Sequence, residues 1–205
     1  MTILMERIGL TTKDLMIIKT PIPLIVLSII YLYFVLKAGP NYMKDRKPYS
    51  LARFIQLYNI FQIMVNTLIV YNIIDLGMYK EYFFSCKIPT YEEGVLNERT
   101  DNLELSIMYL KAFDYIETVL FVLRKKQRQI SFLHLYHHIT TVHFSWLMIK
   151  YYIPGIYLLF GMINCSVHVM MYTYYFFSSF GPSIQKILNP IKPIITTIQM
   201  VSRQV

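Results

Sequence analysis

An apolar stretch of the sequence holds three histidines within five residues, His134, His137 and His138. Residues three and four apart are neighbours on a helix, so the three imidazoles would lie close together. Imidazole exchanges protons near neutral pH, binds metal ions and can attack a thioester as a nucleophile. Histidines can also simply pack a polar helix interface, but three of them in an apolar helix are a costly way to do so. The cluster therefore predicts a chemical site, whereas the solitary His143 is more typical of a structural residue.

A second pattern combines amide, imidazole and phenol side chains. Asn164, His168 and Tyr172 follow one another at intervals of four, and Tyr175 lies beside them. This spacing places them along one stripe of a helix. Aromatic stripes more often serve packing than chemistry, but a histidine between an asparagine and a tyrosine favours a functional site.

A third pattern places charges inside another apolar stretch. Lys111 and Asp114 are three apart and can pair, and Thr118 continues the same helical face, with Glu117 beside it. Each such charge would cost about 2.5 to 3.5 kcal/mol or more if it faced lipid. These side chains must therefore face inward or lie near a membrane surface, where an ion pair could serve either architecture or function.

The elements that carry these patterns are predicted to be membrane helices. Hydrophobic residues make up 55% of the 205-residue chain and charged residues 16%, an apolar share above the range of about 45 to 50% found in soluble domains. A helix needs about 17 to 25 apolar residues to span a bilayer. We expect an all-α, polytopic transmembrane helix bundle that forms a single membrane domain over residues 1–205. The predicted spans are 21–37, 55–78, 105–123, 130–149, 153–178 and 187–205, the last of them incomplete.

Charge placement predicts the orientation of these spans. Residues 37–53 hold five basic and one acidic residue, and residues 124–128 hold four basic and none acidic, which marks both loops as cytosolic. Residues 75–104 hold seven acidic and three basic residues and belong on the other side. The net charge of +8 is thus a topology signal and does not indicate nucleic-acid binding.

The second predicted span carries Asn59, Gln62 and Asn66 at helical spacing on one side. The rest of this segment is aliphatic and aromatic. Amide side chains in a membrane helix favour contacts with other helices over contacts with lipid. We therefore expect this polar seam to face the interior of the bundle.

The three patterns resemble the signatures of the fatty acid elongase family. These signatures are K-x-x-E-x-x-D-T, H-x-x-H-H and N-x-x-x-H-x-x-M-Y-x-Y-Y, and they match residues 111–118, 134–138 and 164–175 in this order. The acidic pair is exchanged, because Asp114 stands where the family usually has Glu and Glu117 where it usually has Asp. The resemblance extends over nearly the whole chain.

Toward the end of the chain the resemblance decays. In the family's T-x-x-Q-x-x-Q pattern, Thr196 and Gln199 match, but Ser202 stands in place of the second Gln. The resemblance implies seven membrane helices followed by a cytosolic tail. Since about six helices are predicted here, we expect the chain to be truncated at its C-terminal end.

The resemblance also implies a function. The family condenses acyl-CoA with malonyl-CoA, which loses carbon dioxide, to give a 3-oxoacyl-CoA. We therefore expect a very-long-chain 3-oxoacyl-CoA synthase that spans the endoplasmic reticulum membrane several times, with the N-terminus lumenal and the histidine box on the cytosolic side. No metal and no cofactor beyond the two CoA substrates is implied. The expected partners are membrane lipid and the 3-oxoacyl-CoA reductase, dehydratase and enoyl-CoA reductase of the later steps.

Within these motifs we hypothesise the following roles. We expect His137 to attack the acyl-CoA, His134 and His138 to orient it, and His168 with Asn164 to assist malonyl decarboxylation and stabilise the enolate. The residues expected to bind substrate are Lys111, Asp114, Asn164, Tyr172 and Tyr175.

Two alternatives remain open from the sequence. Di-iron membrane desaturases and hydroxylases also contain H-x-x-H-H, but this chain has five histidines and one such box, so the ligand count argues against iron. A noncatalytic lipid-binding or transport protein, or an inactive truncated elongase, would instead use the buried charges structurally. Transporters often contain inverted repeats, and none is evident here.

Overall fold

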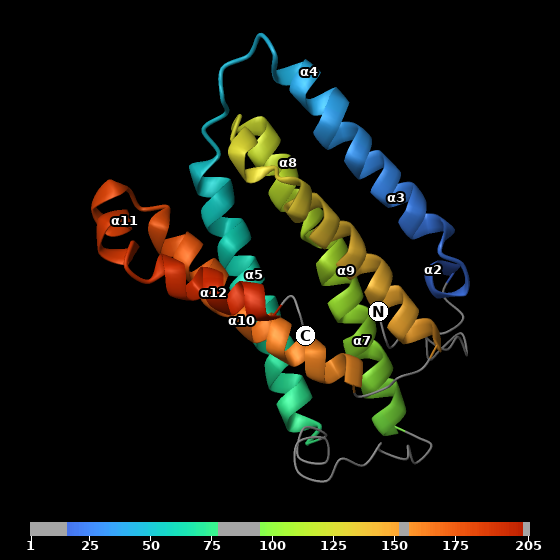
Figure 1. Cartoon of the computed structure of the whole chain (residues 1–205). Helices are drawn as coiled ribbons and strands as arrows, with labels where there is room; N and C mark the ends of the chain where they lie inside the picture. Colours follow the sequence, from blue (N-terminus) through green and yellow to red (C-terminus); the bar gives the residue numbers. More distant parts are fainter. Residues whose placement is uncertain (1–15, 78–94, 152–155, 203–205) are drawn as a thin grey trace. The chain divides into compact units, whose positions relative to one another are not determined.

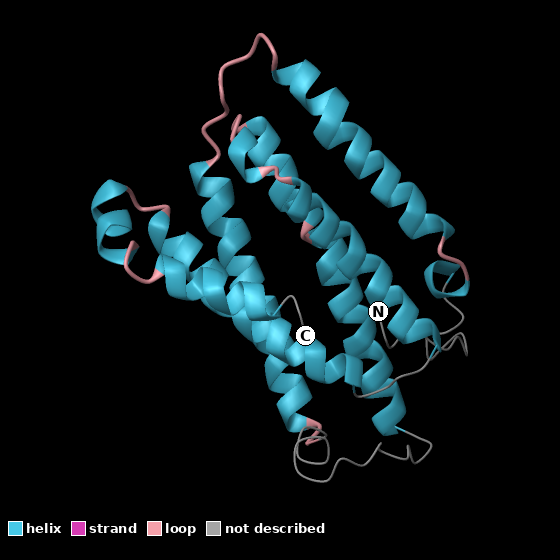
Figure 2. Ribbon diagram, in the orientation of Figure 1, coloured by secondary structure: helices cyan, strands magenta, loops and turns pink. Residues whose placement is uncertain are grey.

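The computed structural model describes residues 16–77, 95–151 and 156–202. Within these ranges the chain forms helices joined by short connections, without any strand (Figure 2). Two described helices, Ile22–Met43 and Ala52–Asp75, are long and apolar enough to cross a membrane. The predicted all-α membrane helix bundle is confirmed.

The chain divides into two compact units, and each is described by itself. Unit 1 comprises Met1–Ser50 and Glu92–Pro154, and unit 2 comprises Leu51–Tyr91 and Gly155–Val205. The prediction of one membrane domain over residues 1–205 stays a prediction. The described helices of unit 1 are α2 (Met16–Lys19), α3 (Ile22–Tyr33), the π-helical turn η2 (Phe34–Ala38), α4 (Gly39–Met43), α7 (Val95–Phe113), α8 (Tyr115–Leu123), the 3₁₀ turn η3 (Gln127–Gln129) and α9 (Phe132–Tyr151). Those of unit 2 are α5 (Ala52–Asp75), α10 (Ile156–Ser178), α11 (Pro182–Leu188) and α12 (Lys192–Ser202).

Within unit 1, α3, η2 and α4 continue one another as a single rod (Figure 1). The rod buries one face, and its exposed side is largely aliphatic, as expected for a helix whose outer surface meets lipid. The buried face consists of Leu24, Ser28, Tyr31, Val35, Gly39 and Met43. A Cβ at Gly39 would lie 2.7 Å from Cγ1 of Val122. Glycine therefore permits a close approach of α4 to α8 that any larger residue would disturb.

The helices α7 and α8 run on in one direction, and α9 returns beside them (Figure 1). Asp114 separates α7 from α8, so the predicted span 105–123 is helical but interrupted, and the helix begins earlier than predicted, at Val95. Lys125 reverses the chain after α8 in the left-handed backbone region, with φ at 55°. The predicted helix at 130–149 corresponds to α9.

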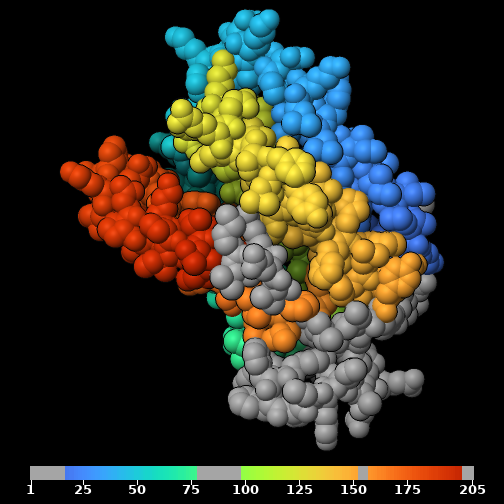
Figure 3. Space-filling view, in the orientation of Figure 1, coloured from blue at the N-terminus to red at the C-terminus, as the bar shows by residue number. Residues whose placement is uncertain are grey.

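An apolar cluster fills the space between these helices. Figure 3 shows α3, in blue, and α9, in yellow to orange, side by side within unit 1. The buried members of the cluster are Ile18, Leu24, Tyr31, Val35, Leu105, Met108, Tyr115, Val122, Leu135, Val142 and Trp146. Because this core draws on α3, α7, α8 and α9 together, it fixes the register of α9, which carries four histidines, against the other helices of unit 1.

The connection after α4 is tied to the end of α8. The Tyr49 N–H donates to the Leu123 carbonyl at 3.1 Å, and the Lys125 ammonium donates to the Lys44 carbonyl at 3.2 Å. The hydroxyls of Tyr42 and Tyr49 lie 3.2 Å apart, and this hydrogen bond lowers the pKa of the Tyr49 phenol below its ordinary value. These contacts join the two basic segments that were predicted to share one side of the membrane.

In unit 2, α5 packs along α10, which also contacts α11 and α12. The predicted helices at 55–78 and 153–178 correspond to α5, which ends at Asp75, and to α10, which begins at Ile156; residues 78 and 153–155 lie outside the described residues. The polar seam of α5 is buried as predicted, with Gln62 and Asn66 fully enclosed and Asn59 3% exposed.

The prediction of one helix over 187–205 is wrong. Residues 187 and 188 end α11, and α12 begins at Lys192. Pro190 and Pro193 explain this break, since proline has no N–H to continue a helix and is tolerated only in a first turn. Pro193 occupies such a position, at the second residue of α12.

Candidate active site

The N-terminal half of α9 carries the histidine cluster, and a serine fixes where this helix begins. The His134 N–H lies 3.2 Å from Oγ of Ser131 and donates to it, and the Leu135 N–H donates to the Ser131 carbonyl at 3.1 Å. A serine in this position satisfies a backbone donor that a helix start would otherwise leave unpaired. His134 thus lies in the first turn of α9, with His137 and His138 one turn later.

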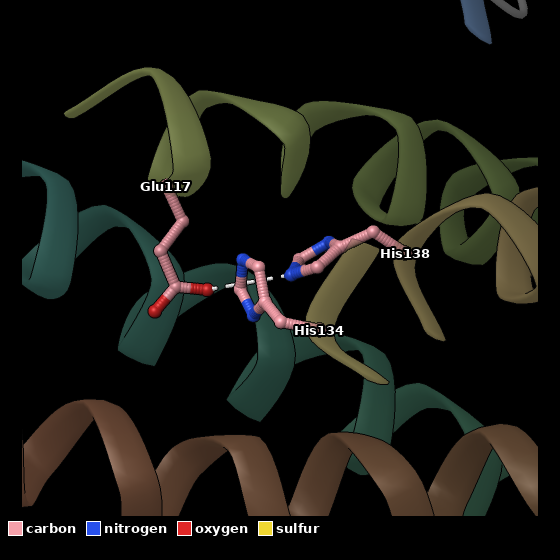
Figure 4. Close-up of side chains that lie close together, drawn as sticks. All are labelled: Glu117, His134 and His138. Carbon is pink, nitrogen blue, oxygen red and sulfur yellow. Dashed lines mark ion pairs between the residues drawn. The ribbon is translucent and has the colours of Figure 1, made fainter. Parts of the chain in front are cut away.

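Two histidines of the cluster face the neighbouring helix α8. The imidazole rings of His134 and His138 lie 4.3 Å apart, centroid to centroid. Nε2 of His134 is 2.9 Å from the Thr118 hydroxyl, and Nε2 of His138 is 3.7 Å from Oε2 of Glu117. Figure 4 shows Glu117, His134 and His138 pointing toward one another from the two helices. His138 is 7% exposed, so this carboxylate is a close countercharge if the imidazole becomes protonated.

A network of hydroxyl groups joins α3 to the same part of α8. The Tyr31 hydroxyl lies 2.8 Å from the Thr118 hydroxyl, and the Ser28 hydroxyl lies 3.0 Å from that of Tyr115. The two phenol rings are stacked, with centroids 4.1 Å apart and planes 15° from parallel. Tyr115 also approaches His138 edge-on, at 6.3 Å between ring centroids. Contacts from α3 therefore hold Tyr115 and Thr118 of α8 in place beside the histidines.

His137 completes the predicted set of three rings. Its ring centroid lies 5.9 Å from that of His138, with the planes 70° apart, and the residue is half-buried. The hydroxyls of Thr140 and Thr141 donate to the His137 carbonyl at 3.2 and 2.9 Å. The three imidazoles do converge, while their individual roles stay predictions.

The predicted pair of Lys111 and Asp114 lies at the junction of α7 and α8. The ammonium nitrogen of Lys111 is 3.8 Å from Oδ2 of Asp114. The two residues are 6% and 3% exposed. Burial makes an unpaired charge expensive, so each stabilises the other in place. The pairing expected from their spacing is confirmed, and their predicted contact with substrate is untested.

The stripe around His168 lies on α10, in unit 2. His168 and Tyr172 have ring centroids 5.8 Å apart, and Tyr172 and Tyr175 are 6.2 Å apart. Tyr172 is 1% exposed and packs edge-on against Tyr58 of α5, at 5.9 Å. Asn164 and His168 are half-buried, whereas Tyr175 is exposed. The stripe is thus built as predicted, and its sharing of one site with the histidines of unit 1 stays a prediction.

Glu117, His134 and His138 could also hold a metal ion. One donor atom from each lies within 4.8 Å of the others, and two imidazoles with one carboxylate form a ligand set that zinc accepts. In the structure, however, Nε2 of His134 already contacts a hydroxyl and Nε2 of His138 faces the carboxylate. We assign no metal to these side chains, and the expected absence of a cofactor is untested.

Sequence reasoning missed Ser28, Tyr31 and Tyr115. The first two are hydroxyl side chains three residues apart in an otherwise aliphatic helix, which places them on one face. This spacing is the signal that could have drawn attention to them. Their partners, however, are 87 residues away in the sequence, and no local pattern connects the two segments.

The chain resembles known proteins over most of its length. The family model described as ELO, the GNS1/SUR4 family, matches residues 16–203. Very long chain fatty acid elongase 4 of Mus musculus is 35% identical over 189 residues, which cover 92% of this chain and 60% of the relative. Very long chain fatty acid elongase F of Drosophila simulans is 40% identical over 181 residues, covering 83% and 66%. For elongase 7 of Rattus norvegicus the identity is 31% over 189 residues, covering 92% and 67%.

This chain thus spans about 60% to two thirds of the length of these curated relatives. The three signature patterns, the all-helical fold and the match to the family model over residues 16–203 agree with one another. The chain belongs to the ELO (GNS1/SUR4) family.

Proposed function

We propose that the protein is the condensing enzyme of very-long-chain fatty acid elongation. It joins an acyl-CoA to malonyl-CoA and releases carbon dioxide, CoA and a 3-oxoacyl-CoA two carbons longer. The observation that carries this proposal is the convergence of His134, His137 and His138, backed by Thr118 and Glu117 of α8. Membership in a family whose relatives are named very long chain fatty acid elongases supports it.

In the first step, a ring nitrogen of His137 attacks the thioester carbonyl of the acyl-CoA. The carbon–sulfur bond breaks, CoA leaves and takes up a proton, and an acyl-imidazole remains. In the second step, malonyl-CoA loses carbon dioxide and the electron pair of the broken bond forms an enolate. The enolate carbon attacks the acyl-imidazole, which releases the 3-oxoacyl-CoA and restores His137.

The contacts in unit 1 support orienting roles for the other two histidines. Nε2 of His134 is engaged by the Thr118 hydroxyl, and Nε2 of His138 faces Glu117. Side chains held in this way are pre-organised, and pre-organised dipoles stabilise developing charge without reorganising during the reaction. Glu117 stabilises positive charge in the cluster while His137 exchanges its acyl group.

The stripe of unit 2 is proposed to serve the malonyl half of the reaction. His168 and Asn164 offer an imidazole and an amide that can hydrogen-bond to an enolate oxygen. Tyr172 and Tyr175 continue the stripe along α10 and are proposed, with Lys111 and Asp114, to bind substrate. These assignments rest on the family motif.

The membrane setting fits the proposed substrates. A bundle of apolar helices can hold a long acyl chain, and the basic segments beside α4 and α8 can attract the phosphates of CoA. We propose the endoplasmic reticulum as the location, with the N-terminus lumenal and the histidines toward the cytosol. The 3-oxoacyl-CoA product then requires a reductase, a dehydratase and an enoyl reductase as partners.

The test is a condensation assay in membranes with a series of acyl-CoAs and isotope-labelled malonyl-CoA, with 3-oxoacyl-CoA detected by mass spectrometry. His137→Ala is expected to lower product formation by about 100-fold or more. His137→Gln retains hydrogen bonding without nucleophilicity and should be equally inactive.

His143→Ala is the matched control. His143 lies on the same helix, is half-buried, and hydrogen-bonds through Nδ1 to the Ile139 carbonyl of its own helix at 2.9 Å. This variant should keep most of the activity. Full activity of folded His137→Ala would overturn the nucleophile assignment, and the absence of product from the folded wild-type chain would favour a noncatalytic role.

A further inference from the structure

The Thr118 hydroxyl stands between two partners from different helices. It lies 2.8 Å from the Tyr31 hydroxyl on α3 and 2.9 Å from Nε2 of His134 on α9. Thr118 is 0% exposed and Tyr31 is 5% exposed. Because Thr118 and Tyr31 are buried, the protons of their hydroxyls have to find acceptors within the protein.

A hydroxyl carries one proton and can accept two hydrogen bonds. In one arrangement, Tyr31 donates to Thr118, and Thr118 donates to Nε2 of His134. In the reverse arrangement, Nε2–H of His134 donates to Thr118, and Thr118 donates to Tyr31. The two arrangements place the proton of a neutral His134 on different ring nitrogens, on Nδ1 in the first and on Nε2 in the second.

The environment of Tyr31 selects between them. Among the described residues, Thr118 is the hydrogen-bond partner of the Tyr31 hydroxyl. In the reverse arrangement the phenol proton would be buried without an acceptor, which is costly. In the first arrangement each of the shared protons has an acceptor.

We propose that Tyr31 is a positioning residue that acts on His134 through Thr118. Its phenol proton occupies the Thr118 oxygen, so the Thr118 proton is directed to Nε2, and neutral His134 is held with its proton on Nδ1. His134 is thereby kept as a neutral acceptor toward Thr118, while Nε2 of His138 lies 3.7 Å from Oε2 of Glu117. This inference rests on the proposed function only for its effect on turnover.

The phenol that directs this proton is itself held in place. The Tyr31 ring stacks on Tyr115, whose hydroxyl is hydrogen-bonded to Ser28 one turn earlier on α3. Tyr31→Phe keeps the stacked ring and removes only the hydroxyl. Ser28→Ala is the matched control, because it removes a hydroxyl contact from the same face of α3 to α8. It leaves the hydrogen bonds that join Tyr31, Thr118 and His134, here called the relay, unchanged.

The direct test reads the tautomer of His134 by nitrogen NMR of the full chain in lipid nanodiscs, with ¹⁵N-labelled histidine. The His134 signal is assigned by its loss in His134→Gln. In the wild-type protein at a pH where His134 is neutral, Nε2 should be unprotonated and Nδ1 protonated. Tyr31→Phe and Thr118→Val should give a mixture of both tautomers, whereas Ser28→Ala and Thr118→Ser should match the wild type.

A wild-type spectrum with the proton on Nε2 would overturn the proposal, and so would a Tyr31→Phe spectrum identical to that of the wild type. If Tyr31→Phe fails to fold, the wild-type spectrum and Thr118→Ser still decide. This readout does not depend on turnover. An inactive wild-type chain with the expected tautomer would therefore refute the proposed function. It would still support the proposed role of Tyr31 in setting the tautomer of His134.

In the condensation assay, Tyr31→Phe should lower kcat about five- to tenfold, the effect of losing one hydrogen bond that orients a catalytic group. KM should stay nearly constant because Tyr31, in this proposal, acts only through Thr118 and His134. Combining Tyr31→Phe with Thr118→Val should be no worse than Thr118→Val alone, since both remove the same path. Additive losses, or an equal loss in Ser28→Ala, would show a merely structural role.

Discussion

Both units bury polar side chains within apolar helices, but they satisfy them differently. In unit 1 the hydrogen bonds cross between helices, from Ser28 to Tyr115 and from Tyr31 through Thr118 to His134. In unit 2, three hydrogen bonds of the seam lie within α5. Gln62 Nε2 donates to the Tyr58 hydroxyl at 2.8 Å, and Asn66 Nδ2 donates to Oε1 of Gln62 at 3.1 Å and to its carbonyl at 2.8 Å.

The hydroxyl network of unit 1 and the polar seam of α5 also differ in the polar atoms that they leave unpaired. In the seam of α5, Nδ2 of Asn59 and Oδ1 of Asn66 are buried without a hydrogen-bond partner among the described residues, whereas no atom of the Ser28–Tyr115 and Tyr31–Thr118 contacts is left so; elsewhere in unit 1, Oε1 of Glu104 is also unpaired. Bonds between helices fix the geometry of the elements they join, whereas bonds along one helix fix only its own side chains. Unit 1 therefore resembles a pre-organised catalytic centre, and the seam of unit 2 retains a donor and an acceptor that water or a polar ligand group could satisfy.

The largest expected effect comes from breaking the buried ion pair of unit 1. Replacing Lys111 by Met or Asp114 by Leu removes the ion-pair partner of a buried charge. We expect each single change to cost about 3 to 5 kcal/mol of the free energy of unfolding. Replacing both residues should lower the free energy of unfolding clearly less than either single change, because both charges of the pair are then removed. Denaturation in detergent, followed by circular dichroism, measures these differences.

Equal destabilisation in the double variant would contradict this reading of the pair. It would mean that each side chain is held mainly by other contacts, and the contrast between the paired charges of unit 1 and the incompletely paired amides of α5 would weaken.

The next effect concerns the carboxylate beside His138. Glu117→Gln retains the shape of the side chain and removes the negative charge that lies 3.7 Å from Nε2. If the site needs positive charge on His138, condensation should fall about 100-fold with the fold intact, within the range for a group that supports proton transfer. Glu117→Asp serves as the control, because it keeps the charge and matches the family's usual residue at this position.

A Glu117→Gln enzyme with normal turnover would show that the carboxylate serves packing alone. Loss of activity in Glu117→Asp as well would show that reach, and not only charge, matters at this position.

Local patterns predicted a large part of this architecture. Apolar runs indicated α3, α5, α9 and α10, and spacing alone indicated the pairing of Lys111 with Asp114, because both partners lie on one helix turn. The interruption at Asp114 was not predicted, since its residues suit a continuous helix. The single helix predicted over 187–205 does not form, because Pro190 and Pro193 interrupt this apolar stretch.

The contacts that were missed share one property. The Ser28 and Tyr31 hydroxyls have partners 87 residues away, and such pairs depend on how α3 packs against α8. That packing follows from the shape of the core and from the close approach at Gly39, neither of which is encoded in a short motif. The histidine motif indicated the candidate site, but not the side chains from α3 and α8 that contact it.

The smallest expected effect is on the free energy of unfolding, and it compares the hydroxyl network of unit 1 directly with the polar seam of α5. Thr118→Val in unit 1 leaves the buried Tyr31 phenol without its partner, and we expect it to lower the free energy of unfolding by about 1 to 3 kcal/mol. Asn66→Leu in unit 2 removes an acceptor that has no partner among the described residues, along with two donated hydrogen bonds that stay within one helix. We expect it to change stability by less than about 1 kcal/mol.

Chemical denaturation of both variants in the same detergent measures the contrast. Thr118→Ser restores a hydroxyl and should recover most of the stability lost in Thr118→Val. A larger loss in Asn66→Leu than in Thr118→Val would show that the amide seam is the better-satisfied network, because only a group with strong native partners can cost that much when removed. The hydrogen bonds that Asn66 donates to Gln62, or a bound water at its Oδ1, would then account for the loss.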